Sequence, residues 1–230
     1  MRTAPVPLTI PTQAMASLSA SGGYGSAMAE NFGVDGLLTV RKAISTVQGD
    51  AKQTELAVTL EGVNIMNVLT LDRLVLHLVM QAPMGTEDAV ITPAGSLLEG
   101  LRIHGKEIQI PSSVGVFDGY PTYSGLEQAY VEGKLTGLIL APGTLGAPCQ
   151  AESLGGCQTR MGDVKATLYS LPAYGGGLRV KDFGTLYLGE YRISRYARRL
   201  TMLRVELGCE TEGSLSLGDG TGNGHWEPPN

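Results

Sequence analysis

Apolar and polar residues alternate with a period of two through most of this chain, and helical periodicity is almost absent. In the segment LDRLVLHLVM, at residues 71–80, one face of the alternation holds Leu74, Leu76, Leu78 and Met80. His77 falls on the opposite face, between Val75 and Val79. Since successive side chains of a strand point to opposite faces, the pattern predicts a strand with one fully buried face and one partly buried face.

The same alternation predicts strands elsewhere in the chain, at residues 36–45, 53–65, 164–169, 183–194 and 198–208. Gly62 lies inside one of these runs and indicates a bend or a bulge. The segment LRIHGKEIQI, at 101–110, is typical of two short strands around a turn at His104 and Gly105. The total of about eight to ten strands predicts an all-β fold, an antiparallel sandwich or barrel.

One short helix is predicted near residues 124–132. Ser124 is a candidate N-cap with Glu127 three residues later, and Gly133 is a candidate stop. Leu126, Ala129 and Tyr130 then share one face. Because the helix interrupts two β-rich stretches, we expect it to cap one end of the sheets.

The chain divides into three parts by composition. Residues 1–30, with prolines at positions 5, 7 and 11, are predicted to form an extended arm, and residues 31–217 a single β-rich domain. Residues 218–230 form a tail rich in glycine and proline. Neither end carries a core of its own, so we expect the two ends to dock, either onto neighbouring copies or onto the same chain.

Composition and charge narrow the class of protein. With 230 residues, 17% of them charged, and 32 glycines, the chain is expected to be ordered and rich in turns. A net charge of -5 disfavours nucleic acid as a partner. The longest apolar stretch, at 63–80, is broken by polar residues, so no membrane span is predicted. No secretory signal is recognisable either, which leaves a cytoplasmic protein or one whose leader has been removed.

Three cysteines bear on the compartment. Cys149 and Cys157 flank a loop with two glycines, and they are interpreted either as two thiols or as a disulfide. The disulfide would imply an oxidising compartment. Cys209 follows an apolar strand and is interpreted as a small buried residue. The three cysteines and His225 lack the paired spacing of zinc sites, and the tail segment DGTGNG has too few carboxylates for calcium. No metal and no cofactor are therefore predicted.

Two groups of residues are candidates for binding. In the tail, His225 and Trp226 could contact a neighbouring subunit or a sugar ring, or Trp226 could fold back on its own sheet. The only basic cluster holds five arginines, namely Arg192, Arg195, Arg198, Arg199 and Arg204. This cluster is either the solvated rim of a hairpin or a docking patch for an acidic polysaccharide or an acidic surface of a second copy.

No catalytic arrangement is recognisable by spacing. His77 lies between valines and is interpreted as a satisfied core histidine, and His104 belongs to a turn. Neither has a serine or cysteine in a triad or elbow context. Glu127 and Glu132 are five residues apart on the predicted helix and so face different sides. The protein is therefore predicted not to be an enzyme.

Four segments together resemble a class of bacterial secreted β domains of unknown function, the choice-of-anchor P type. These segments are GLLTVRKAIS at 36–45, LRIHGKEIQI at 101–110, FGTLYLGEYRIS at 183–194 and RLTMLRVEL at 199–207. The resemblance implies a secreted all-β protein and carries no active site.

The leading hypothesis is a non-catalytic, secreted or cell-surface β protein that acts by self-association or adhesion, with a homo-oligomer as the expected state. The alternative is a carbohydrate-binding module that stacks sugar rings on Trp226 and on loop tyrosines such as Tyr120 and Tyr123. A hydrolase of unknown type is third.

Overall fold

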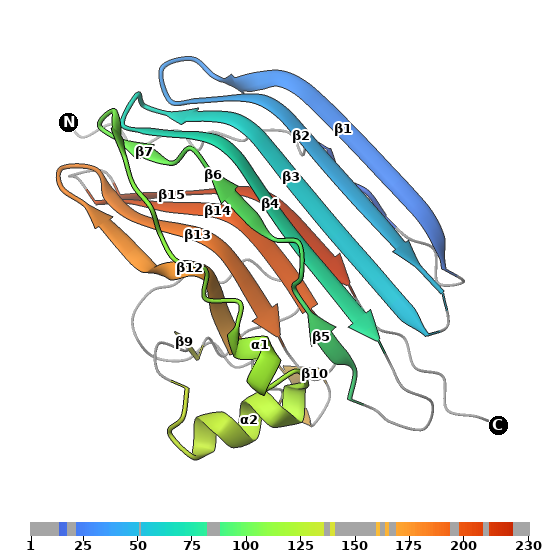
Figure 1. Ribbon diagram of the computed structural model, residues 1–230. Helices are drawn as coiled ribbons and strands as arrows, with labels where there is room; N and C mark the ends of the chain where they lie inside the picture. The colour runs from blue at the N-terminus through green and yellow to red at the C-terminus, as the bar shows by residue number, and fades with distance from the viewer. Residues whose placement is uncertain are drawn as a thin grey trace.

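The computed structural model consists of two antiparallel sheets with two short helices at one end (Figure 1). It describes residues 14–17, 22–50, 52–81, 88–135, 139–140, 160–161, 164–165, 169–193, 198–208 and 212–222. The prediction of an all-β fold is confirmed. Fifteen strands occur in these residues, more than the eight to ten expected, because many are two- or three-residue strands that the alternation is too short to reveal.

The first sheet is built on four long strands that follow one another along the chain. They are β1 (Gly23–Val34), β2 (Leu38–Gly49), β3 (Gln53–Ile65) and β4 (Leu69–Gln81). Four short strands continue the sheet on the far side of β4, namely β5 (Val90–Thr92), β6 (Leu97–Glu99), β7 (Arg102–Ile103) and β8 (Lys106–Glu107). As predicted, His104 and Gly105 form the turn between β7 and β8, and both have a positive φ.

The second sheet has the strand order β15-β14-β13-β12-β9. Its strands are β9 (Ile139–Leu140), β12 (Tyr169–Val180), β13 (Gly184–Ile193), β14 (Arg198–Gly208) and β15 (Glu212–Gly222). The predicted pairing of the segments at 183–194 and 198–208 is the β13–β14 ladder. A separate small ladder joins β10 (Arg160–Met161) to β11 (Val164–Lys165).

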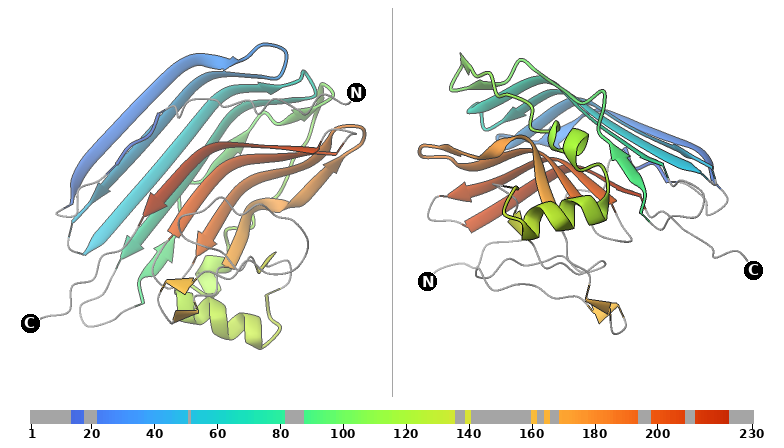
Figure 2. Two further views of the ribbon diagram at one scale, coloured as in Figure 1. Left: turned by 180° about the vertical axis from the view of Figure 1, so that it is seen from behind. Right: turned by 60° about the horizontal axis from the view of Figure 1, so that its bottom comes forward.

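The hydrophobic core lies between the two sheets. The predicted inward face of β4 is confirmed, since Leu74, Leu76 and Leu78 are fully buried and Met80 is nearly so. Contacts between the sheets join β15 to β3 and β14 to β4. The first sheet is therefore offset from the second, and β1 and β2 extend beyond the edge formed by β15 (Figure 2).

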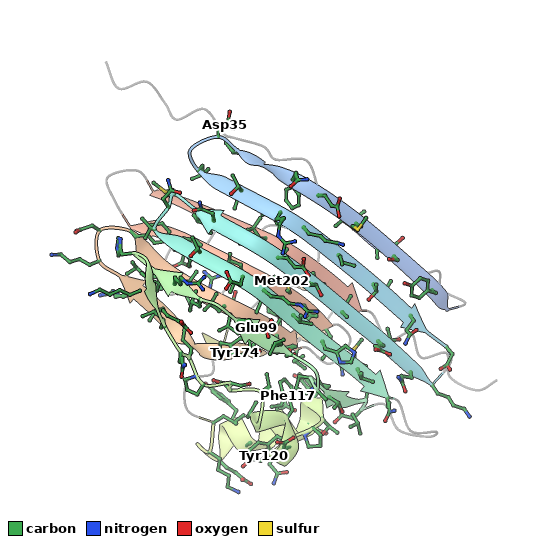
Figure 3. All side chains as sticks on the ribbon, turned by 45° about the horizontal axis from the view of Figure 1, so that its top comes forward. Asp35, Glu99, Phe117, Tyr120, Tyr174 and Met202 are labelled. Atoms are coloured by element: carbon green, nitrogen blue, oxygen red, sulfur yellow. The ribbon has the colours of Figure 1, made fainter. Side chains whose placement is uncertain are left out.

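Both sheets contain a line of residues where the alternation of faces switches. In the first sheet the ladder omits one position on each strand, namely Asn31, Arg41, Gly62 and Asp72, and these positions lie side by side. Asn31 and Gly62 have a positive φ, which confirms that Gly62 interrupts its strand. In the second sheet, Gly189 and Gly218 have a positive φ at the corresponding gap in the ladders, on either side of buried Met202, which Figure 3 labels.

The predicted helix is α2 (Tyr123–Val131), preceded by the short α1 (Val116–Gly119). Its N-cap is Thr122 and not Ser124, because the Thr122 hydroxyl accepts from the Gly125 N–H while Ser124 donates to Asp88. Leu126 and Ala129 are buried as expected, whereas Tyr130 is 37% exposed. Gly133 adopts a positive φ just after the helix, as a stop residue does.

The ends of the chain differ from the expected division. Strand β1 begins at Gly23, so residues 23–30 belong to the sheet, and β15 continues to Gly222. Ala14 and Ala16 pack against the core of their own chain, so this part of the arm docks onto the same chain, which is one of the two expected arrangements. Among the helices of the described residues, none is long and apolar enough to cross a membrane.

Candidate functional site

The outer face of the first sheet, the side away from the second sheet, carries side chains aligned in rows across the strands (Figure 3). One row is formed by cross-strand neighbours Met28, Ile44, Thr59, Val75 and Leu97. Four of these five residues are apolar and Thr59 is polar. Met28 is 59% exposed at one end of the row, and Leu97 is 39% exposed at the other. Aligned apolar side chains that remain partly exposed are typical of a surface that another molecule covers.

The neighbouring row is charged, with signs that alternate from strand to strand. Its members are Glu30, Lys42, Glu61, Arg73 and Glu99, the last of which is labelled in Figure 3. The Lys42 ammonium lies 3.6 Å from the Glu30 carboxylate, and the Arg73 guanidinium 4.0 Å from the Glu61 carboxylate. Such exposed pairs contribute little to stability. Their alternation removes like-charge neighbours and leaves the row without a large net charge.

Strand β1 is the open edge of this sheet. It runs for twelve residues and, in the described part of the chain, pairs only with β2. Its single charged residue is Glu30, and it contains neither lysine nor proline. Tyr24 and Met28 are 69% and 59% exposed. Natural edge strands are usually protected from pairing with another strand by charged residues, by prolines or by their short length. Apart from Glu30, β1 has none of these protections.

The sequence interpretation missed this edge because residues 23–30 were assigned to the extended arm. A signal was nevertheless present. The segment GYGSAMA, at residues 23–29, alternates between small and larger residues and holds no charge. An uncharged alternating run next to a strand pair predicts an additional strand at the edge.

His77 lies on the outer face and is half-buried, so it is satisfied as predicted but is not a core residue. Its Nε2 atom is 2.7 Å from Glu55 Oε1, and its Nδ1 atom contacts the carbonyl oxygen of Ala94. The hydrogen bonds from Gln48 and His77 lower the pKa of Glu55. Both ring nitrogens of His77 are thus occupied by protein acceptors, which leaves neither free to act as a base.

The hydroxyl groups nearest to His77 are also occupied. Ser96 Oγ lies 2.6 Å from the Tyr191 hydroxyl, donates to the Pro93 carbonyl at 2.9 Å and accepts from the backbone N–H of His77 at 3.1 Å, whereas the imidazole nitrogens contact Glu55 and Ala94. Tyr191 is fully buried, packs edge-on against Phe117, and has a raised pKa because of its burial. This cluster holds the loop before β6 against the second sheet and does not have the geometry of a nucleophile and its base.

Of the five predicted arginines, Arg204 is engaged within the chain. Its Nε and Nη2 atoms donate to the Glu190 carboxylate at 2.9 and 3.0 Å, and its Nη1 atom donates to Glu206. The guanidinium also lies over the Tyr187 ring, 3.6 Å from the centroid. Burial acts to lower the pKa of Arg204, but the hydrogen bonds and charge of Glu190 raise it above its usual value. Arg204 is therefore not presented to an acidic ligand.

The other four arginines do not form one patch. Arg198 is buried, and burial lowers its pKa although Asp88 and Tyr123 act in the opposite direction. Arg192 lies 3.8 Å from Glu190, on the same face as Arg204. Arg199 is opposite Arg192 in the ladder, but its side chain lies outside the described residues, as does all of Arg195. The cluster in sequence thus divides between the interior and one face of β13 and β14.

The remaining candidates from the sequence fall elsewhere. His225, Trp226, Cys149 and Cys157 lie outside the described residues. Tyr123 is only 6% exposed, so it cannot act as a stacking platform for a sugar. Within the described ranges, no group of three or more histidine, cysteine, aspartate or glutamate side chains is arranged to hold a metal ion.

Comparison with models of known protein families identifies the family of the chain. Residues 2–140 match the model of a family described as Domain of unknown function (DUF8256), which covers more than half of the chain, including the whole first sheet. No curated protein and no solved structure matches the chain. The resemblance to secreted β domains of the choice-of-anchor P type remains a prediction.

Proposed function

Since the chain belongs to the DUF8256 family of unknown function, we propose from its own surfaces that it is a non-catalytic β protein that self-associates through the open edge of β1. The observation that carries the proposal is the length and lack of protection of this edge, together with exposed Tyr24 and Met28 on it. Pairing of two edges extends a sheet with main-chain hydrogen bonds and needs no further element.

The side chains of β1 favour a second copy of the same strand as the partner. In an antiparallel pair with its two-fold axis at Ser26, Tyr24 of one copy lies opposite Met28 of the other. Contacts between a thioether and an aromatic ring contribute roughly 0.3–1.5 kcal/mol each, and the symmetry provides two of them. Glu30 then lies opposite Gly22 and not opposite another carboxylate, so the pairing brings no like charges together.

The proposal includes a location outside the cytosol, where adhesion or assembly at a surface would take place. This part rests on the resemblance to secreted β domains and on the short loop between Cys149 and Cys157. Peptide mapping of native protein without reduction tests it, and recovery of both cysteines as alkylated thiols would contradict it.

The assembly is tested by light scattering after size-exclusion chromatography. The wild-type protein should elute as a dimer or larger species whose share rises with concentration. Met28→Lys places an unpaired charge on the edge and should shift the protein to monomer. Thr39→Lys is the matched control, because Thr39 is exposed on β2 opposite Gly33, outside the stretch of residues 22–30 that the proposed pairing uses.

A wild-type protein that is monomeric at millimolar concentration would overturn the proposal. Equal loss of assembly in the Met28→Lys and Thr39→Lys variants would also contradict it, since a general charge effect and not the β1 edge would then be responsible. Circular dichroism of each variant establishes that the fold is retained.

A further inference from the structure

A cleft of about 290 Å³ lies where the turn of the β7–β8 hairpin meets the turn of the β12–β13 hairpin, far from the β1 edge. Its floor is apolar and comes from both sheets. Ile103 belongs to β7 and Ile108 directly follows β8, whereas Leu178 and Val180 belong to β12. Ile103, Ile108 and Leu178 remain partly exposed, so the floor offers apolar surface to a ligand.

The charged residues that line the cleft are all basic. Lys106, Arg179 and Lys181 line it together with His104, and all four are exposed. In the described part of the chain, Lys106, Arg179 and Lys181 take part in none of the ion pairs. A local group of unpaired cations is unexpected in a chain whose net charge is -5.

The acidic residues of the two hairpins do not line the cleft. In the β7–β8 ladder, Ile103 is paired with Lys106, and Arg102 is paired with Glu107. Arg102 and Glu107 therefore lie on the face of the hairpin opposite to the face that Ile103 and Lys106 share. Glu107 interacts with Arg102, which is bound to Asp72 at 2.9 Å. Asp182 lies in the β12–β13 turn but does not line the cleft. The carboxylates of the two hairpins therefore form no ion pair with Lys106, Arg179 or Lys181 among the described residues.

From this arrangement we infer that the cleft binds a small amphiphile, an alkyl chain with one carboxylate, whose chain covers the apolar floor and whose carboxylate meets the cations of the rim. Lysine and arginine bind carboxylates by charge-assisted hydrogen bonds, and burial of methylene groups supplies the remaining affinity. The volume of about 290 Å³ is just below the range of small-molecule sites, which is roughly 300–1,000 Å³, so one short chain fits better than a polymer.

The site is tested by a titration followed by nuclear magnetic resonance of the backbone amides. Octanoate is the probe, octan-1-ol has the same chain without the charge, and acetate has the charge without the chain. Octanoate should shift the amides of residues 103–108 and 178–181, and the two controls should bind at least about tenfold more weakly.

Two variants make the test specific. The double variant Lys106→Glu and Lys181→Glu should weaken octanoate binding at least about tenfold. Lys52→Glu reverses an exposed cation at the other end of the sheet and should change it less than about twofold. All three substitutions replace exposed side chains, so the spectra of both variants should otherwise retain the dispersion of the folded protein.

Several results would overturn the inference. If octan-1-ol bound as tightly as octanoate, the cations would not contribute to binding. If acetate produced the same shifts as octanoate, the apolar floor would not contribute. An unchanged affinity in the double variant would place octanoate elsewhere. If the protein did not bind octanoate but sedimented with phosphatidylglycerol vesicles, the ligand would be a membrane surface and not a free amphiphile.

Discussion

Individual residues of this protein illustrate how the face of a strand decides what a charged side chain does. Glu190 is 3% exposed, yet it lies on the face of β13 opposite Tyr191, which points into the core. Its carboxylate receives two hydrogen bonds from Arg204. A buried carboxylate of this kind depends on its partner, because either charge left alone would be poorly solvated.

Replacement of Glu190 by alanine should therefore reduce the free energy of unfolding by about 3 kcal/mol, the lower end of the range for breaking a buried ion pair. The measurement is the midpoint of urea denaturation at an unchanged slope. Glu132→Ala removes an exposed pair with Lys134 and serves as the control, with an unchanged midpoint expected. A similar small shift in both variants would show that the Glu190 pair is not a structural requirement.

The arginine cluster marks the limit of prediction from sequence at this scale. Arg192, Arg198 and Arg204 lie within a short stretch of sequence, which indicated one basic patch. The stretch turns back between β13 and β14, and β14 switches its faces near Met202. Arg198 consequently points inward while Arg204 points outward. Sequence proximity could not reveal this, because the switch depends on the neighbouring strands.

Among the elements, the long strands were predictable and their irregularities were not. The alternation in β4 identified its buried face, and Gly62 in β3 indicated a bend. The line of switches across the whole sheet, however, arises from the alignment of Asn31, Arg41 and Asp72 with Gly62, and only the register creates that alignment. A glycine in a strand indicates an irregularity but not its partners.

The switch in the second sheet gives a prediction for Gly189. This residue has φ +69°, and a Cβ atom there would lie 2.7 Å from the Ala173 Cβ and 2.9 Å from a methyl carbon of Leu76. Backbone strain and overpacking together should make Gly189→Ala destabilising by about 3 kcal/mol in thermal or urea unfolding. Gly119→Ala, where a Cβ meets nothing within 4 Å, should have little effect. Equal stability of the two variants would contradict the argument.

The N-terminus of α2 gives a prediction about pH. Burial acts to raise the pKa of Asp88, but hydrogen bonds from the Ser124 side chain and from the N–H groups of Ser124 and Tyr123 lower it below its usual value. Because the pKa is lower in the folded chain, the stabilisation is complete above the unfolded pKa of about 3.9 and is lost as the pH falls through the folded value.

Wild-type protein should consequently be more stable than Asp88→Asn by a constant amount above about pH 5, and the difference should shrink below about pH 4. Urea midpoints measured for both proteins from pH 6 to pH 2.5 provide the comparison. A difference that grew on acidification would show that the neutral side chain, and not the carboxylate, is the better partner for the helix N-terminus.

For the whole molecule, the offset between the two sheets was the least predictable property. Strand order follows chain order in each sheet, but nothing in the pattern indicates that β15 stacks on β3 and leaves β1 and β2 beyond it. The projecting strands are nevertheless partly buried on their inner face, where the backbone of Ser17 lies close to Gly25 of β1. Residues 14–17 therefore cover part of the inner face that the second sheet leaves open, and β1 is left with an open edge and an exposed outer face.

This role of the N-terminal segment depends on Gly25, where the backbones approach closely. A Cβ atom at position 25 would lie 2.4 Å from the carbonyl oxygen of Ser17. Gly25→Val should therefore displace residues 14–17 and uncover the inner face of β1 and β2. Hydrogen exchange of the N-terminal peptide should accelerate, and a loss of about 1 kcal/mol would lower the Tm by roughly 2–4 °C. Ser26→Ala, on the opposite face, should change neither quantity. If Gly25→Val leaves the exchange unchanged, the segment does not depend on this approach, and the inner face must be protected by other means.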